Sequence, residues 1–206
     1  MIAPGNSTKI LALSDETVPY VYSPSVKHHF GEVDLIVGCG DLPVAYLEFV
    51  VSMLNKPLFY VPGNHDPNNY DVPGGQSVDG LFARHDQLLL AGAGGSIRYK
   101  PEGRHQYTQR QMYQRVIAML PRMVLHRVLH GRGIDIFVSH ASPHGIQDAS
   151  DPAHVGFSAF HAVIQLARPR YLLHGHTHIQ RNLEQSKTRV ADTLVVNVYP
   201  QRVIDL

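Results

Sequence analysis

The sequence predicts an α/β fold, and two observations carry this prediction. Short apolar runs of strand length recur along the chain, and five of them are followed at once by Asp, Asn or His. Segments with apolar residues at helical spacing lie between these runs, at residues 43–55 and from Thr108 onward. Strands that alternate with helices in this way are typical of an α/β domain.

The first part of the chain alternates strands with turns and one helix. A strand over residues 9–14 ends at Asp15, and a second strand covers residues 34–37. Pro43 suits the first position of the helix that follows, because its missing N–H would lack a helical partner there anyway. The apolar run at residues 58–62 is the third strand.

The middle of the chain is less regular. Residues 67–79 are rich in Asn, Pro and Gly, and we expect them to form a long loop at the rim of a substrate site. A strand over residues 88–91 ends in a glycine turn that matches neither a dinucleotide-binding motif nor a P-loop. The helix that starts near Thr108 contains Pro121, which we expect to kink or split it.

The last third of the chain returns to strands. We expect a strand over residues 134–139, an irregular stretch, a helix over residues 158–167 and a strand over residues 171–174. The chain then closes with short antiparallel strands at residues 179–183, 190–191 and 194–198.

Polar side chains with metal-binding chemistry follow the five strands. They are Asp15, Asp41, Asn64 with His65 and Asp66, His140, and His176 with His178. In an open α/β sheet the carboxyl ends of the strands share one edge, so these side chains are expected to converge. Imidazole, carboxylate and amide oxygen together suit zinc, manganese or iron better than magnesium or calcium. Any one of these residues could equally start a turn or occupy the core, so the prediction rests on the set.

Length and composition set the class of protein. At 206 residues, with 44% apolar and 17% charged residues, the chain predicts one globular domain spanning residues 1–206. The net charge of +1 indicates no general attraction to nucleic acid or membrane surfaces. Cys39 is the single cysteine, and neither a signal peptide nor an apolar membrane span is evident. We therefore expect a cytoplasmic location and no membrane partner.

The tract from Gly103 to Ile134 contains arginines but no Asp or Glu. A helix with a solvated cationic face explains this pattern most simply. The alternative is an electropositive rim for phosphate-bearing substrates or for an acidic partner.

The chain resembles the calcineurin-like metallophosphoesterase family in five motifs, which are Asp15, Gly40-Asp41, Gly63-Asn64-His65-Asp66, Ser139-His140 and Gly175-His176-Thr177-His178. The tract from Gly94 to Thr108 is also similar to compact bacterial members of the family that have no cap domain. The resemblance implies a sandwich of two mixed β-sheets flanked by helices. It also implies two divalent transition-metal ions, with manganese first and iron, zinc or nickel as alternatives.

The resemblance assigns roles to individual residues. Asp15, Asp41 and His178 would bind the first metal, and Asn64, Asp41, His140 and His176 the second. His65 would act in catalysis with Asp66 orienting it. A hydroxide held between two cations about 3.5 to 4 Å apart would attack the phosphorus atom.

One position departs from the family pattern. Thr17 stands where the family has a first-metal histidine, and a neutral hydroxyl is a poorer ligand. The first metal would then be held by fewer protein groups, by water, or by a substitute ligand such as Glu16, His28 or His29.

The expected substrate is a phosphate ester, most simply a phosphodiester or nucleotide. Arg98, Tyr99 and Arg104, near the glycine turn, are candidates for contacting its phosphate. Nucleic acid fits the chemistry, although the net charge does not favour it. Two other functions are weighed against this one: a relative that keeps the fold as a binding scaffold, which Thr17 suggests, and a serine hydrolase built on Ser139-His140, for which no Gly-x-Ser-x-Gly elbow exists.

Overall fold

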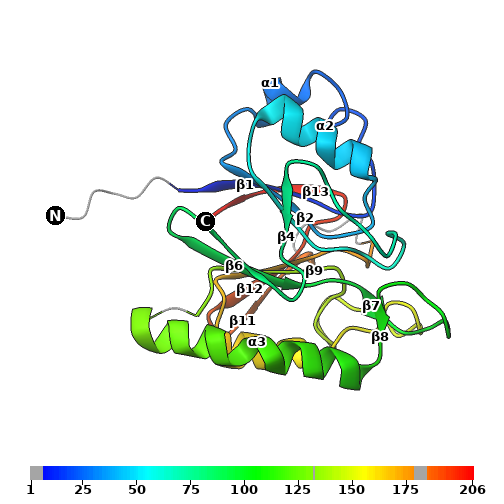
Figure 1. Cartoon of the computed structure of the whole chain (residues 1–206), viewed down its shortest axis with the longest axis vertical. Coiled ribbons are helices and arrows are strands. Elements are labelled where there is room, and N and C mark those ends of the chain that lie inside the picture. Colours follow the sequence, from blue (N-terminus) through cyan, green and yellow to red (C-terminus); the bar gives the residue numbers. More distant parts are fainter. Residues whose placement is uncertain (1–6, 132, 179–184) are drawn as a thin grey trace.

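The computed structural model describes residues 7–131, 133–178 and 185–206 and has four layers (Figure 1). Two β-sheets pack face to face in the middle. Helices α1 (Val26–Phe30) and α2 (Val44–Leu54) cover the outer face of one sheet, and α3 (Gln109–His130), α4 (Ala159–Ala162) and the π-helical η1 (Val163–Ala167) cover the other. The predicted α/β sandwich is therefore confirmed.

The first sheet has five strands in the order β13-β1-β2-β3-β4. Its strands are β1 (Lys9–Leu13), β2 (Leu35–Gly38), β3 (Leu58–Tyr60), β4 (Gly75–Ser77) and β13 (Gln201–Asp205). Strands β1 to β4 run parallel to one another, whereas β13 runs antiparallel to β1. The carboxyl ends of β1, β2 and β3 consequently meet at one edge of this sheet.

The second sheet has six strands in the order β11-β12-β10-β9-β6-β5. They are β5 (Phe82–His85), β6 (Leu88–Ala93), β9 (Ile136–Ser139), β10 (Tyr171–His174), β11 (Lys187–Val190) and β12 (Thr193–Asn197). Only the outer strands β5 and β11 are antiparallel to their neighbours. A separate pair, β7 (Ser96–Ile97) and β8 (Gln106–Tyr107), precedes α3. The strand predicted at residues 179–183 lies outside the described residues.

Alternating side chains along each inner strand face different layers. In β9, Ile136 and Val138 join the core between the sheets, whereas Phe137 joins the core under α3 and α4. In β2, Leu35 and Val37 face the sheet interface. This period of two explains why strands buried on both faces read as continuous apolar runs in the sequence.

Helix α3 is one continuous helix of 22 residues, so of the two outcomes predicted for Pro121, a kink or a split, the split is wrong. Thr108 caps its first turn, and Gln111 completes a capping box. Pro121 is exposed, which leaves water able to reach the carbonyl group whose helical hydrogen bond the proline removes. In the described part of the chain, no helix has both the length and the apolar character that a bilayer crossing requires.

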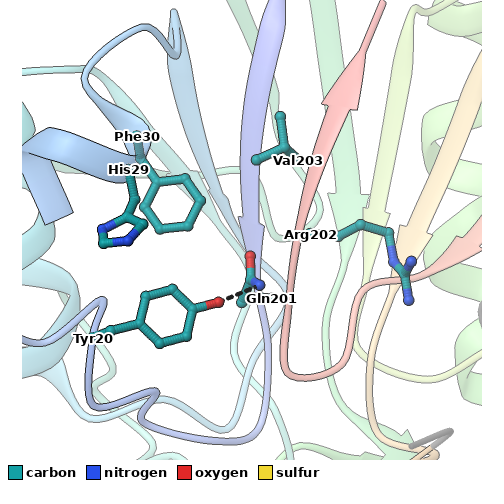
Figure 2. A pocket seen from close by; sticks show the side chains of 6 residues that line it. All are labelled: Tyr20, His29, Phe30, Gln201, Arg202 and Val203. Atoms are coloured by element: carbon teal, nitrogen blue, oxygen red, sulfur yellow. Dashed lines mark hydrogen bonds between the residues drawn. The ribbon is translucent and has the colours of Figure 1, made fainter. Parts of the chain in front are cut away.

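A hollow of about 510 Å³ lies beside edge strand β13 (Figure 2). Tyr20, His29 and Phe30 line one side, and Gln201, Arg202 and Val203 line the other. The Gln201 amide donates a hydrogen bond of 2.7 Å to the Tyr20 hydroxyl across the floor. His29 therefore lies beside β13, the edge strand of the five-stranded sheet.

Candidate metal centre

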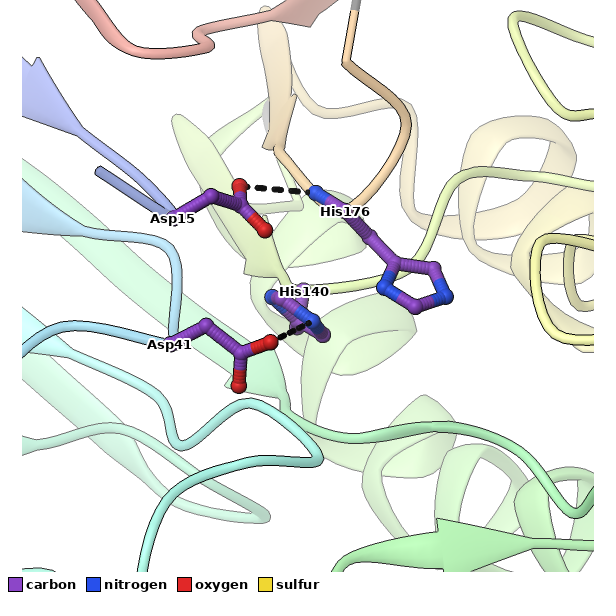
Figure 3. Close-up of side chains that lie close together, drawn as sticks. All are labelled: Asp15, Asp41, His140 and His176. Atoms are coloured by element: carbon purple, nitrogen blue, oxygen red, sulfur yellow. Dashed lines mark hydrogen bonds and ion pairs between the residues drawn. The ribbon is translucent and has the colours of Figure 1, made fainter.

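The predicted metal-binding residues come from both sheets and meet between them (Figure 3). Asp15 and Asp41 follow β1 and β2 of the five-stranded sheet, and His140 and His176 follow β9 and β10 of the six-stranded sheet. One ligand atom from each of these four residues lies within 4.8 Å of the others. The Asn64 side-chain oxygen joins the group at 3.1 Å from His140 Nε2.

The backbone bends sharply where these side chains leave the strands. Asp15, Asp41 and His176 have φ angles of 64°, 56° and 64°, in the left-handed region that residues other than glycine seldom adopt. Such conformations concentrate at functional sites, because the surrounding structure must hold them in place.

Two glycines let the loops approach each other. A Cβ atom on Gly63 would overlap the Asp41 carboxylate and its backbone nitrogen. A Cβ atom on Gly175 would overlap the side chains of Ser14 and Asp15. Glycine at these two positions is therefore a steric requirement of the cluster.

The His140 ring is fully buried and has a fixed orientation. Its Nδ1 lies 2.8 Å from the Cys39 carbonyl oxygen, which can only accept, so Nδ1 carries the proton of this bond. Its Nε2 lies 3.3 Å from Asp41 Oδ2. Burial alone would lower the pKa of His140, but the Asp41 carboxylate outweighs it and raises the pKa to about 9. Burial alone would raise the pKa of Asp41, but the nearby His140 outweighs burial and lowers this pKa to about 2.

His176 has the opposite electrostatic character. Burial and the nearby charge of His140 lower its pKa to about 3, so the imidazole is neutral at pH 7. Its Nε2 donates to the Ala153 carbonyl oxygen at 2.7 Å, which leaves Nδ1 as the unprotonated nitrogen. Its backbone N–H donates to Asp15 Oδ2 at 2.9 Å (Figure 3). This geometry suits a metal ligand, whose second nitrogen normally binds a backbone or carboxylate acceptor.

Asp66 links the loop that carries Asp41 to the loop that carries Gly63. Its carboxylate accepts hydrogen bonds from the backbone N–H groups of Gly63 at 2.7 Å and Asp41 at 2.9 Å. Burial raises the pKa of this carboxyl. These bonds hold the Asp41 loop against the Gly63 loop, whereas the sequence predicted that Asp66 orients the His65 ring.

His65 and His178 lie at the solvent side of the cluster. The His65 side chain is 70% exposed, with Nε2 4.0 Å from Asp41 Oδ2. The His178 side chain is 54% exposed, with Nε2 3.8 Å from Asp15 Oδ1. The ring of Tyr199 stacks on His178 at 4.2 Å, and the Tyr199 hydroxyl donates to Glu16. The nearby Asp15 carboxylate raises the pKa of His178.

A hollow of about 320 Å³ opens above the cluster. Its lining consists of Asp15, Asp41, Asn64, His65, Tyr99, Ala153, His154, His176 and His178. Of the three candidates for phosphate contact, Tyr99 lines this hollow, and its hydroxyl accepts from the Asn64 amide at 3.3 Å. Residues 67–79, predicted to form a loop at the substrate rim, contain strand β4 and contribute nothing to the lining.

The two arginine candidates lie elsewhere. Arg98 donates to the Gln106 carbonyl oxygen and to the Gln111 side chain, near the start of α3. Arg104 is exposed and is not part of the lining. Both arginines are close to the site in sequence, but neither side chain lines the hollow.

The sequence did not single out His154 as part of this site. His154 lines the hollow, its ring centroid lies 4.7 Å from that of His176, and its Nδ1 lies 2.8 Å from Asp151. The sequence carries little indication of this position, because His154 lies in an irregular stretch after His140 and does not follow a strand directly.

The structure also narrows which residue could replace the first-metal histidine that the family has at the position of Thr17. His29 lines the hollow beside β13 that Figure 2 shows, and both His28 and His29 line a second hollow beside that strand. Neither residue lines the hollow of the metal centre. Glu16 is next to Asp15 and accepts a hydrogen bond from Tyr199, the residue that stacks on His178.

Ser139 is buried, and its hydroxyl donates to the Ala141 carbonyl oxygen. A hydroxyl held in this way does not suit a nucleophile, which removes the basis for a serine hydrolase.

The donor set fits divalent transition metals. Two carboxylates, two imidazoles and an amide oxygen converge at a largely buried point, and neutral imidazole favours zinc, manganese or iron over calcium. Buried carboxylates of this kind are normally paired with cations, and in the metal-free protein a protonated His140 fills that role.

Comparisons with known proteins agree with the motifs. The sequence model of the calcineurin-like phosphoesterases matches residues 27–180. The uncharacterized protein MJ1162 of Methanocaldococcus jannaschii is 23% identical over 198 residues, which cover 86% of this chain and 83% of the relative. The 3',5'-cyclic adenosine monophosphate phosphodiesterase CpdA of Haemophilus influenzae is 24% identical over 181 residues, which cover 82% of this chain but only 63% of that relative.

Solved structures show the same fold. The crystal structure of TT1561 of Thermus thermophilus superimposes with a TM-score of 0.65 at 18% identity, over 94% of this chain and 89% of that one. Because the family model spans most of the chain and the motifs lie together in the structure, the protein belongs to the calcineurin-like phosphoesterase family.

Proposed function

We propose that the protein is a metal-dependent phosphodiesterase with a dinuclear centre. The observation that carries this proposal is the buried convergence of Asp15, Asp41, His140 and His176 from two different sheets. Family membership supports phosphoester chemistry, and the activity in the name of the CpdA relative supports a phosphodiester substrate. The hollow above the cluster is open and small, which suits a compact diester or a nucleotide.

The chain would hold two cations in neighbouring sites. Asp15, Asp41 and His178 would form the first site, and Asn64, Asp41, His140 and His176 the second, an assignment that their proximity supports. When bound, the cations supply charge that polarises the phosphoryl oxygens and lowers the pKa of a coordinated water. Manganese is the metal we would test first, with iron, zinc and nickel as alternatives.

The exposed residues at the mouth of the hollow would act on the substrate. His65 is oriented by its backbone N–H, which donates to Asp41 Oδ1 at 2.8 Å, and its exposed ring can reach a bound ester. We assign it to stabilising the transition state or protonating the leaving oxygen. Tyr99 can donate its hydroxyl proton to a phosphoryl oxygen while it accepts from Asn64.

Hydrolysis of bis(p-nitrophenyl) phosphate with added manganese tests the proposal, with Asp41→Asn as the inactivating variant. Asp86→Asn is a matched control, because Asp86 is an exposed carboxylate whose φ of 50° resembles the 56° of Asp41. Asparagine tolerates this conformation, so both backbones are preserved. Manganese content and circular dichroism are measured on all three proteins.

We expect manganese-dependent activity in the wild type and in Asp86→Asn, and its loss in Asp41→Asn. p-Nitrophenyl phosphate, run in parallel, separates a diesterase from a monoesterase. The assay is repeated with iron, zinc and nickel, and folded wild-type protein that binds none of the four metals, or that binds them without hydrolysing either ester, would refute the enzymatic proposal and favour a scaffold role.

A further inference from the structure

Helix α3 carries apolar side chains on two opposite faces. The inner face contributes Met112, Val116, Met119 and Met123 to the core. The outer face exposes four large apolar side chains, which we call the α3 ridge: Ile117 at 58%, Leu125 at 58%, Val128 at 75% and Leu129 at 65%. Their spacing places them along one side of the helix. An exposed apolar stripe of this length on a surface helix marks an interaction site.

The surroundings of the α3 ridge are positively charged. Between Gly103 and Ile134 the sequence contains no carboxylate side chain, so the net charge of +1 hides a local excess of cations. Arg122 beside the ridge lies over the ring of Phe82 at 4.4 Å, which leaves its charge without a carboxylate partner in that contact. Arg115, by contrast, pairs with Asp79 at 2.5 Å and is neutralised.

A cationic hollow adjoins the carboxyl-terminal end of the ridge. It has a volume of about 240 Å³ and is lined by Arg127, Gly131, Gly133, Arg168, Arg170 and Asp192. Three arginines therefore share this hollow with one carboxylate, which lies 3.4 Å from Arg168. The Arg127 guanidinium donates to the Leu166 carbonyl oxygen, so its charge has no carboxylate partner in that bond. Arginine clusters of this kind match the geometry of phosphate oxygens.

We propose that this face of the protein docks on an anionic phospholipid membrane, with the α3 ridge in the interfacial layer and a lipid phosphate in the arginine hollow. The two features point to the same occupant, because phospholipid offers an apolar layer directly beneath a layer of phosphates. Helix α3 also forms the whole lower side of the molecule in Figure 1, so a flat surface can contact it along its length. A second copy of the chain packed ridge against ridge would bring together two helices that lack carboxylate side chains, and the like charges of their arginines disfavour that contact.

Co-sedimentation of the full chain with vesicles tests the proposal independently of phosphoesterase activity. Vesicles of phosphatidylcholine alone are compared with vesicles that also contain phosphatidylglycerol. The ridge is tested with Leu125→Gln/Val128→Gln, and the hollow with Arg168→Gln/Arg170→Gln. Matched controls lie on the other sheet and its helices: Val203→Gln, at a residue that is 43% exposed on β13, and Lys27→Gln, at an exposed residue of α1.

The wild type and both controls should sediment with the phosphatidylglycerol vesicles and bind phosphatidylcholine far less. The hollow variant should lose about fivefold in partitioning for each arginine, and added salt should weaken wild-type binding. The ridge variant should lose at least about tenfold. Equal binding to both vesicle types, or binding that neither double variant reduces, would overturn the proposal. So would a wild-type dimer, measured by light scattering, that the ridge variant dissociates while no vesicle binding is seen.

Discussion

The carbonyl oxygen of Cys39 lies 2.8 Å from Nδ1 of His140, and this single bond decides which way the ring faces the metal centre. Because Nδ1 must carry the proton, Nε2 is the nitrogen presented to Asp41 and Asn64. The residue that orients the ligand follows β2, whereas the ligand follows β9. The backbone of one sheet therefore fixes a side chain of the other.

Metal binding should release a proton from His140. In the metal-free protein the pKa of His140 is raised to about 9 and that of Asp41 is lowered to about 2, so at pH 7 they form a charged pair. A metal requires neutral imidazole, so the proton must leave. Manganese affinity should rise about tenfold per pH unit from about pH 6 to 8 and level off above about pH 9. Titration calorimetry in buffers of different ionisation enthalpy measures the released proton, and an identical heat in all buffers would contradict this assignment.

His65→Ala should reduce the rate and leave the metals in place. The His65 ring is exposed at the mouth of the hollow, whereas the buried ligands lie beneath it. General acid catalysis is worth about 10²- to 10⁴-fold, so kcat should fall within that range. Manganese content measured by elemental analysis should equal that of the wild type. Loss of metal in this variant would make His65 a ligand and remove its catalytic role.

Thr17→His should strengthen the first metal site. Threonine stands where the family has an imidazole ligand, and His178, the other histidine of that site, is half exposed. The second manganese ion should bind more tightly in the variant, as measured by calorimetry and by the spin coupling of paired ions. Thr17→Ser serves as the control and should bind like the wild type. Two tight sites in the wild type, unchanged in Thr17→His, would show that another residue such as Glu16 already completes the site.

Gly63→Ala should damage both stability and metal binding. The added methyl group would overlap Asp41, and overpacking of this kind costs about 1–3 kcal/mol. Gly131→Ala is the matched comparison, because its φ of 75° strains alanine while no atom lies within 4 Å of the new methyl group. Thermal melts should show a loss in both variants, about 1 kcal/mol for Gly131→Ala. Only Gly63→Ala should lose manganese affinity, and equal affinities would contradict the steric explanation.

The parts of the site that could be predicted from sequence are those encoded locally. Asp15, Asp41 and His140 each follow an apolar strand directly, and parallel pairing brings strand ends to a common edge. The predicted convergence of Asp15, Asp41, His140 and His176 is what the structure shows. The fold class was predictable for the same reason, because strand and helix periodicities are local properties.

The parts that could not be predicted depend on contacts between distant segments. His154 reaches the hollow because its loop folds back until the Ala153 carbonyl oxygen meets His176, which no local pattern encodes. Arg98 is close to the site in sequence, but its hydrogen bond to Gln111 draws it toward α3. Pro121 stays within a helix because tertiary packing of the inner face outweighs the loss of one hydrogen bond.

The division of the ligands between the two sheets gives bound cations a mechanical role. Asp15, Asp41 and Asn64 belong to one sheet and His140 and His176 to the other, so a cation shared among them fastens the halves of the sandwich together. Metal binding would stabilise the folded state against separation of the sheets, so the melting temperature should rise with metal occupancy. The centre proposed for the chemistry would thereby also hold the two sheets of the fold together.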